Sequence, residues 1–232
     1  MKLLILSDIH ANWNALEAVL ARESYGGLVF LGDAVDFGPD PGNCVKFLMS
    51  SSKRRFWAVR GDHDHCMAYG TNSKCTQELR NISAVSREWG EGYLTSGEVG
   101  FLRRLPVVSS FSIDGADFEM AHGSDRNPLQ LDGYNRERQP EDNRRRFILV
   151  GHSHKPFIMN SGSTTIINPG SVGQPRDFNP GASYAVIENG EARIERASYD
   201  IGKTVKGLEK SSMPAYVKAK LISVLLHGGI VN

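Results

Sequence analysis

Acidic residues and histidines come directly after five short apolar runs in this sequence. Short apolar runs bounded by polar residues are typical of buried strands. The carboxyl ends of parallel strands lie along one edge of a sheet, where ligands bind. We therefore expect the acids and imidazoles that follow these runs to meet at one place. They are Asp8, His10, Asp33, Asp62, His63, Asp64, His122, His152 and His154.

Two of these motifs place their ligands two residues apart. Asp8 and His10 form a D-x-H motif, and His152 and His154 form an H-x-H motif. Side chains two residues apart in an extended segment lie on the same side, so each motif can bind one ion twice. A single histidine after a strand is most often an ordinary loop residue, but five of the seven histidines occupy such positions. This coincidence indicates a metal site.

The ligand types narrow the choice of metal. Carboxylates and imidazoles without thiolates suit Mn, Fe, Co, Ni or Zn better than Ca or Mg, and we favour Mn. Seven candidate ligands exceed what one ion needs, which indicates two ions that share a bridging carboxylate. Two ions about 3.5–4 Å apart are the usual arrangement for in-line phosphoryl displacement.

Composition disfavours several classes of protein. A length of 232 residues suits one α/β domain or two small ones. A formal net charge of +1 and a sequence pI near 7.8 give no overall attraction to long nucleic acid or to anionic membranes. The first apolar run is too short for a signal peptide, and no run approaches a membrane span. Three cysteines without a C-x-x-C pair suit a reduced cytoplasm, so we expect a cytoplasmic protein with no membrane partner.

Strand-like and helix-like segments alternate in the first half of the chain. The apolar runs 2–6, 27–31 and 56–59 are separated by the helix-like segments 14–23 and 41–51. This alternation predicts right-handed βαβ units and a parallel sheet.

The second half of the chain consists mainly of short strand-like runs without regular helices between them. A helix is expected at about 76–89, followed by short strands separated by glycine, proline and asparagine. Asn189 and Gly190 predict a hairpin turn. Residues 123–146 form a polar stretch that exceeds ordinary loop length, so we expect a functional lid or a partly mobile loop there. Two amphipathic helices are expected after Asp200.

Arg60, Gly61 and Asp62 form R-G-D, a tripeptide that can act as an adhesion signal on secreted loops. That function needs an extracellular location and explains none of the other motifs. We therefore interpret Arg60 as incidental to adhesion.

The motifs "DIH", "GDAVD", "GDHD", "HG" and "GHSH", in this order, resemble those of the calcineurin-like metallophosphoesterases over residues 1 to about 199. The segments "LGDAVDFGPDPGNCV" and "INPGSVGQPRD" resemble the compact bacterial phosphodiesterase branch of that superfamily. The resemblance implies an α/β fold, a two-sheet β-sandwich flanked by helices in four αββα layers. We expect one domain over 1–232, with C-terminal helices from about residue 200. The implied activity is hydrolysis of a phosphodiester, nucleotide-like or another small organic phosphate, by in-line attack of a metal-bound hydroxide.

The resemblance also implies a role for each ligand. One group of residues would bind the first metal, one carboxylate would bridge both ions, and a second group would bind the second metal. In that order they are Asp8, His10 and His154; Asp33; and Asp62, His122 and His152.

The catalytic histidine implied by the resemblance is His63, as transition-state stabiliser or leaving-group acid. Asp64 would orient it by accepting its other N–H. Position 62 departs from the family, which most often has asparagine there. Counting Asp62, three carboxylates bring −3 against +4 from two divalent ions. We therefore expect tighter metal binding and a less electrophilic cluster.

Three further residues carry two interpretations each. Asp36 either accepts a hydrogen bond from a ligating histidine or caps the turn that follows it. Arg176 belongs to a structural turn or binds a phosphate oxygen in a bidentate manner. Asn12 either lines the substrate pocket or only starts a helix.

Two other functions are compatible with the same fold. One is a phosphomonoesterase or protein phosphatase, and the other is a non-catalytic metal-binding scaffold. A scaffold is expected to have lost ligands, whereas every motif position is filled in this sequence.

Overall fold

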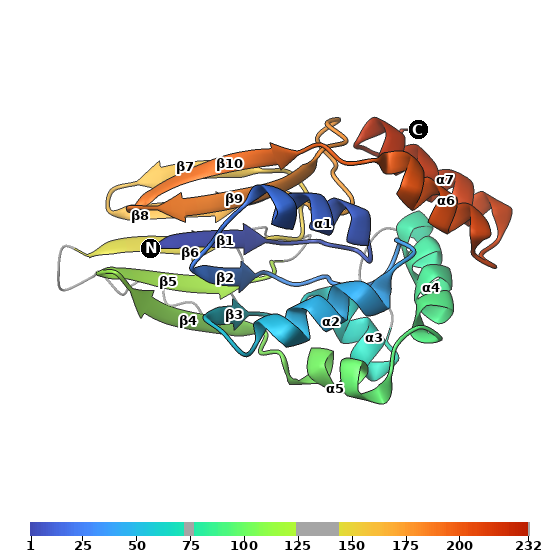
Figure 1. Cartoon of the computed structure of the whole chain (residues 1–232), viewed down its shortest axis with the longest axis horizontal. Helices are drawn as coiled ribbons and strands as arrows, with labels where there is room; N and C mark the ends of the chain where they lie inside the picture. Colours follow the sequence, from blue (N-terminus) through green and yellow to red (C-terminus); the bar gives the residue numbers. More distant parts are fainter. Residues whose placement is uncertain (72–76, 124–143, 232) are drawn as a thin grey trace.

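The computed structural model describes residues 1–71, 77–123 and 144–231. Two five-stranded sheets form a sandwich, and helices flank it (Figure 1). This confirms the predicted two-sheet α/β fold. The predicted lid at 123–146 lies almost entirely outside the described residues.

The first sheet has the strand order β10-β9-β1-β2-β3. Its first three strands in the chain are parallel, as the alternation of strand and helix predicts, and β9 runs antiparallel to β1. The strands are β1 (Lys2–Leu6), β2 (Gly27–Phe30), β3 (Phe56–Ala58), β9 (Ala182–Glu188) and β10 (Glu191–Ala197).

The second sheet has the order β4-β5-β6-β8-β7, with β5, β6 and β8 parallel. Its strands are β4 (Val108–Ile113), β5 (Ala116–Ala121), β6 (Arg145–Leu149), β7 (Phe157–Ser161) and β8 (Thr164–Asn168). Burial alternates along β5, which is the pattern of a sheet with one face on the core.

Helices cover the outer face of the first sheet and one end of the sandwich (Figure 1). They are α1 (Trp13–Arg22), α2 (Pro41–Ser51), α3 (Asp62–Tyr69), α4 (Gln77–Glu91), α5 (Ser96–Arg104), α6 (Ile201–Lys210) and α7 (Ala215–His227). The helix expected at 76–89 is α4, and the two expected after Asp200 are α6 and α7. Within the described ranges the layers are therefore helices, sheet and sheet. None of the helices described there forms the fourth layer of the αββα arrangement over the second sheet.

The hairpin predicted at Asn189 and Gly190 joins β9 to β10. Glu188 pairs with Glu191, which leaves a two-residue loop. Both loop residues have positive φ, 53° and 78°. Asparagine followed by glycine favours this conformation because both tolerate the left-handed region.

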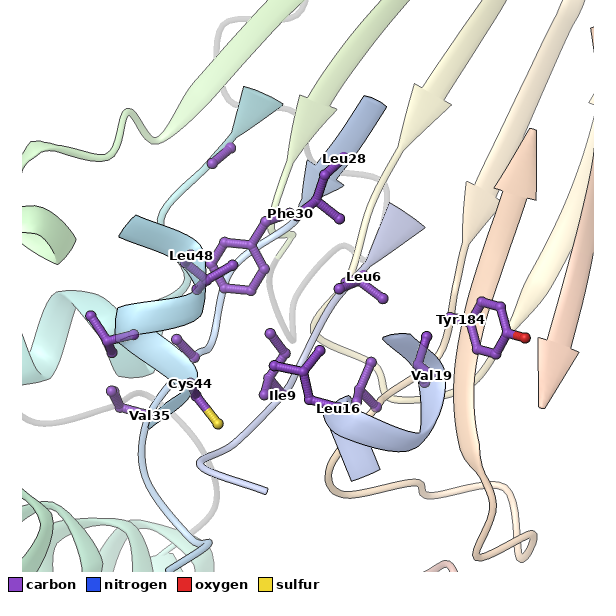
Figure 2. Packing of buried hydrophobic residues seen from close by; sticks show 14 of the residues in the cluster. Leu6, Ile9, Leu16, Val19, Leu28, Phe30, Val35, Cys44, Leu48 and Tyr184 are labelled. Carbon is purple, nitrogen blue, oxygen red and sulfur yellow. The ribbon is translucent and has the colours of Figure 1, made fainter. Parts of the chain in front are cut away.

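Strand β1 is buried on both faces. Leu4 and Leu6 pack toward the helices, and Leu3 and Ile5 pack between the sheets. Figure 2 shows Leu6 among side chains of the helical side of the core. Burying each such side chain contributes roughly 1.5–3 kcal/mol. A strand buried on both faces explains the continuous apolar run that precedes Asp8.

A third apolar cluster joins the C-terminal helices to the end of the sandwich. Leu208 of α6 and Leu221 of α7 pack with Ile82 of α4 and with Phe37, which follows β2. The last two helices are thereby held against the loops that follow the strands.

The R-G-D tripeptide does not form an exposed loop. Gly61 is buried and precedes the first residue of α3, Asp62. The Arg60 guanidinium donates from Nη1 to the Arg103 carbonyl at 2.7 Å. The tripeptide therefore leads into α3 and bonds to the end of α5. Among the described residues, no helix is long and apolar enough to cross a membrane.

Candidate metal centre

The loops after five strands meet at one end of the sandwich. Three of these strands, β1, β2 and β3, belong to the first sheet, and β5 and β6 belong to the second. In Figure 1 the arrows of β1, β2 and β5 point toward the same end. Sequence reasoning expects one parallel sheet edge, but two sheets contribute because their parallel strands run in a common direction.

Asp8, His10 and His154 form the first of two ligand groups. The Nε2 atom of His154 lies 3.1 Å from Oδ1 of Asp8, and that of His10 lies 3.8 Å from the same oxygen. All three side chains are buried. The structure brings together the three residues expected to bind the first metal.

The second group consists of Asp33, Asp62, His122 and His152. The Nε2 atom of His122 lies 3.0 Å from Oδ2 of Asp33 and 3.3 Å from Oδ1 of Asp62. The Nδ1 atom of His152 lies 3.1 Å from that Asp62 oxygen. These are the residues expected around the second metal and the bridge.

Asp33 stands between the two groups. Its Oδ2 atom is 3.0 Å from Nε2 of His122 in one group and 3.9 Å from Nε2 of His10 in the other. Oδ1 of Asp33 accepts the backbone N–H of His63 at 2.9 Å. The carboxylate is therefore fixed through one oxygen while the other faces both groups, which suits a bridging ligand.

Three buried polar atoms facing this space make no hydrogen bond within the described part of the chain. They are Oδ1 of Asp8, Oδ2 of Asp33 and Nε2 of His122. Buried polar atoms are nearly always hydrogen-bonded, and each exception calls for an explanation such as a bound ion. Two carboxylate oxygens and an imidazole nitrogen suit a divalent transition metal. The residues therefore fit the metals that the motifs imply.

Backbone carbonyls fix the orientation of three of the imidazoles. Nδ1 of His10 lies 2.9 Å from the Val35 carbonyl, and Nδ1 of His122 lies 2.6 Å from the Leu31 carbonyl. Nδ1 of His154 likewise contacts a carbonyl oxygen, at 2.5 Å. A carbonyl only accepts, so Nδ1 carries a proton in each case and Nε2 is directed to the cluster. This is the usual way in which proteins prepare histidine for metal binding.

His63 lies at the edge of the second group with both ring nitrogens facing acids. Nδ1 lies 2.7 Å from Oδ2 of Asp36, and Nε2 lies 3.9 Å from Oδ2 of Asp62. Burial lowers the pKa of His63, but Asp33, Asp62 and Asp36 outweigh burial and raise the pKa to about 10 in the metal-free chain. Burial would raise the pKa of Asp62, yet His63 and the neighbouring imidazoles hold it below its usual range. The structure thus pairs a protonated imidazole with carboxylates beside the cluster.

Comparisons with known proteins agree with this geometry. A family model described as the calcineurin-like phosphoesterase superfamily domain matches residues 1–191. The chain belongs to this superfamily. It is therefore a metal-dependent phosphoesterase, a hydrolase of phosphoric esters.

Individual relatives of this phosphoesterase cover most of its length. An uncharacterised protein of Methanocaldococcus jannaschii is 30% identical, with 94% of this chain and 96% of the relative aligned. Phosphodiesterase YfcE of Escherichia coli is 28% identical, with 82% of this chain and 88% of the relative aligned. The crystal structure of a metallophosphoesterase from Sphaerobacter thermophilus superposes with a TM-score of 0.75 at 27% identity, covering 98% of this chain and 99% of that one.

The predicted orienter of His63 is wrong: Asp36, and not Asp64, accepts from the imidazole. The Asp64 carboxylate accepts backbone N–H groups of Asp33 and Ala34, each at 2.8 Å, and of Gly61 at 3.2 Å. Asp64 is the third residue of α3, so its side chain turns back over the start of the helix toward the loop after β2. It therefore holds the loop that carries Asp33.

The Asn12 side chain is buried inside the fold. It is 1% exposed and its hydrogen-bonding atoms are used internally. Nδ2 donates to the carbonyl of Gly173 and to the Tyr199 hydroxyl, and Oδ1 accepts from Ala15 N–H and the Thr204 hydroxyl. Asn12 thus caps α1 and links it to α6, in keeping with the second interpretation, and its role in the substrate pocket stays a prediction.

Arg176 lies close to the first ligand group. Its backbone N–H donates to the carbonyl of His154 at 3.3 Å, and its guanidinium donates to Oε1 of Gln174 at 3.2 Å. Burial, followed by the charge of Arg176, lowers the pKa of His154. The guanidinium is thus near enough to act electrostatically on the centre.

Close backbone approach makes Gly61 a functional residue that sequence reasoning missed. A Cβ atom at this position would lie 2.0 Å from Oδ1 of Asp33 and 2.5 Å from the Asp33 nitrogen. Any larger residue would displace the central carboxylate. The glycine of the "GDHD" motif is the signal that could have identified it.

Ser83 and Arg87 of α4 were also missed. Both contact Asp36, the partner of His63. In the sequence they are two ordinary polar residues four positions apart on a helix, so nothing in their type or spacing distinguishes them from a solvated face.

Proposed function

We propose that the chain is a dinuclear metal-dependent phosphodiesterase that acts on a small nucleotide-like or other organic phosphate. The position of Asp33 is the observation that supports two ions most directly, because one of its oxygens faces both ligand groups. The likeness to phosphodiesterase YfcE supports a diester over a monoester.

Each ligand group is proposed to bind one ion. Asp8, His10 and His154 would hold the first, and the group of Asp62, His122 and His152 the second, with Asp33 shared. Manganese remains our preferred ion, since carboxylate and imidazole ligands suit it. When bound, two such ions activate water near neutral pH and neutralise charge on the phosphoryl oxygens.

His63 is proposed to act on the substrate itself. Asp36 binds Nδ1 at 2.7 Å, which leaves Nε2 directed toward the side of Asp62 and the cluster. A proton on Nε2 can stabilise charge that develops on a phosphoryl oxygen or pass to the leaving oxygen. Arg176 is proposed to bind a phosphate oxygen, since it lies beside His154 and carries a guanidinium.

We make two further proposals, on the domain organisation and on the location of the protein. We propose one catalytic domain over 1–232, because Leu208 and Leu221 of the last two helices pack on Phe37 next to the centre. We propose a cytoplasmic location, which the free thiols of Cys44 and Cys66 support.

The test is hydrolysis of bis(p-nitrophenyl) phosphate and p-nitrophenyl phosphate, each with Mn²⁺ and with chelator. We expect chelator-sensitive turnover that is faster for the diester, with two ions per chain by metal analysis. His63→Ala should retain both ions and lose about 10²–10⁴-fold in kcat, the usual contribution of a general acid or base. Faster turnover of the monoester would identify a phosphatase instead. No turnover of either ester by protein that carries two ions would support the scaffold.

A further inference from the structure

One oxygen of Asp36 collects three donors at the edge of the metal centre. Oδ2 lies 2.7 Å from Nδ1 of His63, 2.9 Å from Oγ of Ser83 and 3.2 Å from Nη2 of Arg87. The other oxygen, Oδ1, is buried and makes no hydrogen bond to any described residue. The orientation of this carboxylate therefore depends on the donors at Oδ2.

Two of the three donors come from α4, which lies outside the metal-binding motifs of the sequence. Ser83 and Arg87 are four residues apart, so they lie on the same face of the helix. Nη2 of Arg87 also donates to Oγ of Ser83 at 2.8 Å, and Nη1 donates to the carbonyl of Thr71 at 2.8 Å. Ser83 is fully buried and Arg87 is 9% exposed. Counting the bonds to Asp36, the guanidinium thus makes three hydrogen bonds to described residues, and the hydroxyl donates one and accepts one.

Asp36, Ser83 and Arg87 form one hydrogen-bonded network with the His63 imidazole. Oγ of Ser83 is 3.2 Å from Nδ1 of His63 and bonded to the Asp36 oxygen that Nδ1 contacts. A buried carboxylate is costly unless it is paired and hydrogen-bonded, and Arg87 supplies the opposite charge. Without these donors, Asp36 could rotate away from Nδ1 and His63 could turn about its side-chain bonds.

We infer that Ser83 and Arg87 are positioning residues of His63. They fix the Asp36 carboxylate, so that Nδ1 of the imidazole stays hydrogen-bonded and Nε2 stays directed to the metal centre. The kinetic part of this inference rests on the proposed function, whereas the structural part does not.

The experiment compares Ser83→Ala with Ser86→Ala. Both serines are buried in α4, and both changes remove one hydroxyl. The Ser86 hydroxyl accepts the backbone N–H of Phe37 at 3.0 Å and touches neither Asp36 nor His63. Ser86→Ala therefore controls for the loss of a buried hydroxyl that anchors the same loop. Arg87→Met and Arg87→Lys form a second pair of variants. Lysine keeps the positive charge but lacks the two guanidinium nitrogens that donate to different acceptors.

The first measurement is steady-state hydrolysis of bis(p-nitrophenyl) phosphate with metal content determined in parallel. We expect Ser83→Ala to lose about tenfold in kcat, part of the contribution of a general acid, with KM and bound metal unchanged. Ser86→Ala should keep the wild-type kcat. Arg87→Lys should recover part of the kcat that Arg87→Met loses.

The second measurement needs no activity. In metal-free protein, the His63 Nδ1–H proton should give a downfield NMR resonance, assigned by its loss in His63→Ala. The resonance should shift or broaden in Ser83→Ala and remain in Ser86→Ala. An unchanged resonance together with an unchanged kcat in Ser83→Ala would overturn the inference. If the wild-type protein hydrolyses no ester, the proposed function fails, and the resonance alone decides about positioning.

Discussion

Replacing Asp33 by asparagine tests whether one carboxylate serves two ions. Oδ2 of Asp33 lies 3.0 Å from His122 of one ligand group and 3.9 Å from His10 of the other. Asp33→Asn should therefore weaken both ions, whereas His152→Ala should weaken only the second and His154→Ala only the first. Each protein is compared with itself in chelator, so that the intrinsic cost of the mutation cancels.

The size of the effect follows from binding linkage. One ion at a free concentration of 100 times its Kd stabilises the fold by about 2.7 kcal/mol, so two ions contribute about 5 kcal/mol. For a domain of 150–250 residues, each kcal/mol raises Tm by roughly 2–4 °C. We therefore expect the metal-dependent rise in Tm to be about 10–20 °C for the wild type. It should be about half of that for His152→Ala or His154→Ala, and close to zero for Asp33→Asn.

The assay is thermal unfolding by circular dichroism, with and without Mn²⁺, together with metal analysis. Metal content should fall from two ions to one in the histidine variants and further in Asp33→Asn. The reasoning would be refuted if Asp33→Asn kept one ion and half of the rise, because the carboxylate would then belong to one group alone.

Three further outcomes are expected. Asp62→Asn should bind its second metal less tightly and turn over faster, because it removes a negative charge from the cluster; titration of metal and kcat check this, and equal affinity with equal kcat would contradict it. The charge of Asp33 outweighs burial and raises the pKa of His122 well above its usual value. Metal must therefore displace a proton from His122, so metal affinity should fall as pH falls. Calorimetry in two buffers measures the protons released on binding. Asn12→Ala should cost about 1–3 kcal/mol of stability through unpaired buried groups and leave KM unchanged; a raised KM would support a role of Asn12 in the pocket.

The parts of the fold and the site that could be predicted are those encoded locally. Strand β1 is buried on both faces, which produces the apolar run from Leu3 to Leu6 and makes the following Asp8 conspicuous. The D-x-H spacing is equally local, and Asp8 and His10 lie in one ligand group. The expectation that the H-x-H motif binds one ion twice is wrong, because His154 joins that group and His152 joins the second. Asn189-Gly190 encodes its own turn.

The unpredicted parts depend on contacts between distant segments. Whether Asp36 or Asp64 accepts from His63 is decided by how α3 starts against the loop after β2, and sequence spacing carries no information on that angle. Ser83 reaches the site only because α4 packs beside Phe37. The contact of Ser83 with Asp36 therefore follows from the position of α4 in the fold and not from the local sequence.

The loops that carry the ligands contain strained backbone. Positive φ values, which are costly outside glycine, recur in the loops that carry the ligands. Such residues cost of order 1–3 kcal/mol each, so the surrounding structure must hold them in place. The residues are Asp8, His10, Ala11, Asp33, Asp36, Phe37, His152 and His154.

This strain persists because the loops are tied to each other and to the sheets. The backbone N–H of Asp8 donates to the Gly32 carbonyl at 2.9 Å, that of His10 to the Asp33 carbonyl at 3.0 Å, and that of Ala11 to the Ala34 carbonyl at 2.8 Å. The loops after β1 and β2 thus form a short ladder beyond the sheet, anchored by strands that are buried on both faces. The burial of β1 and β2 offsets the strain of the loops. The ligands are therefore held in place by the buried strands and by the hydrogen bonds between the loops.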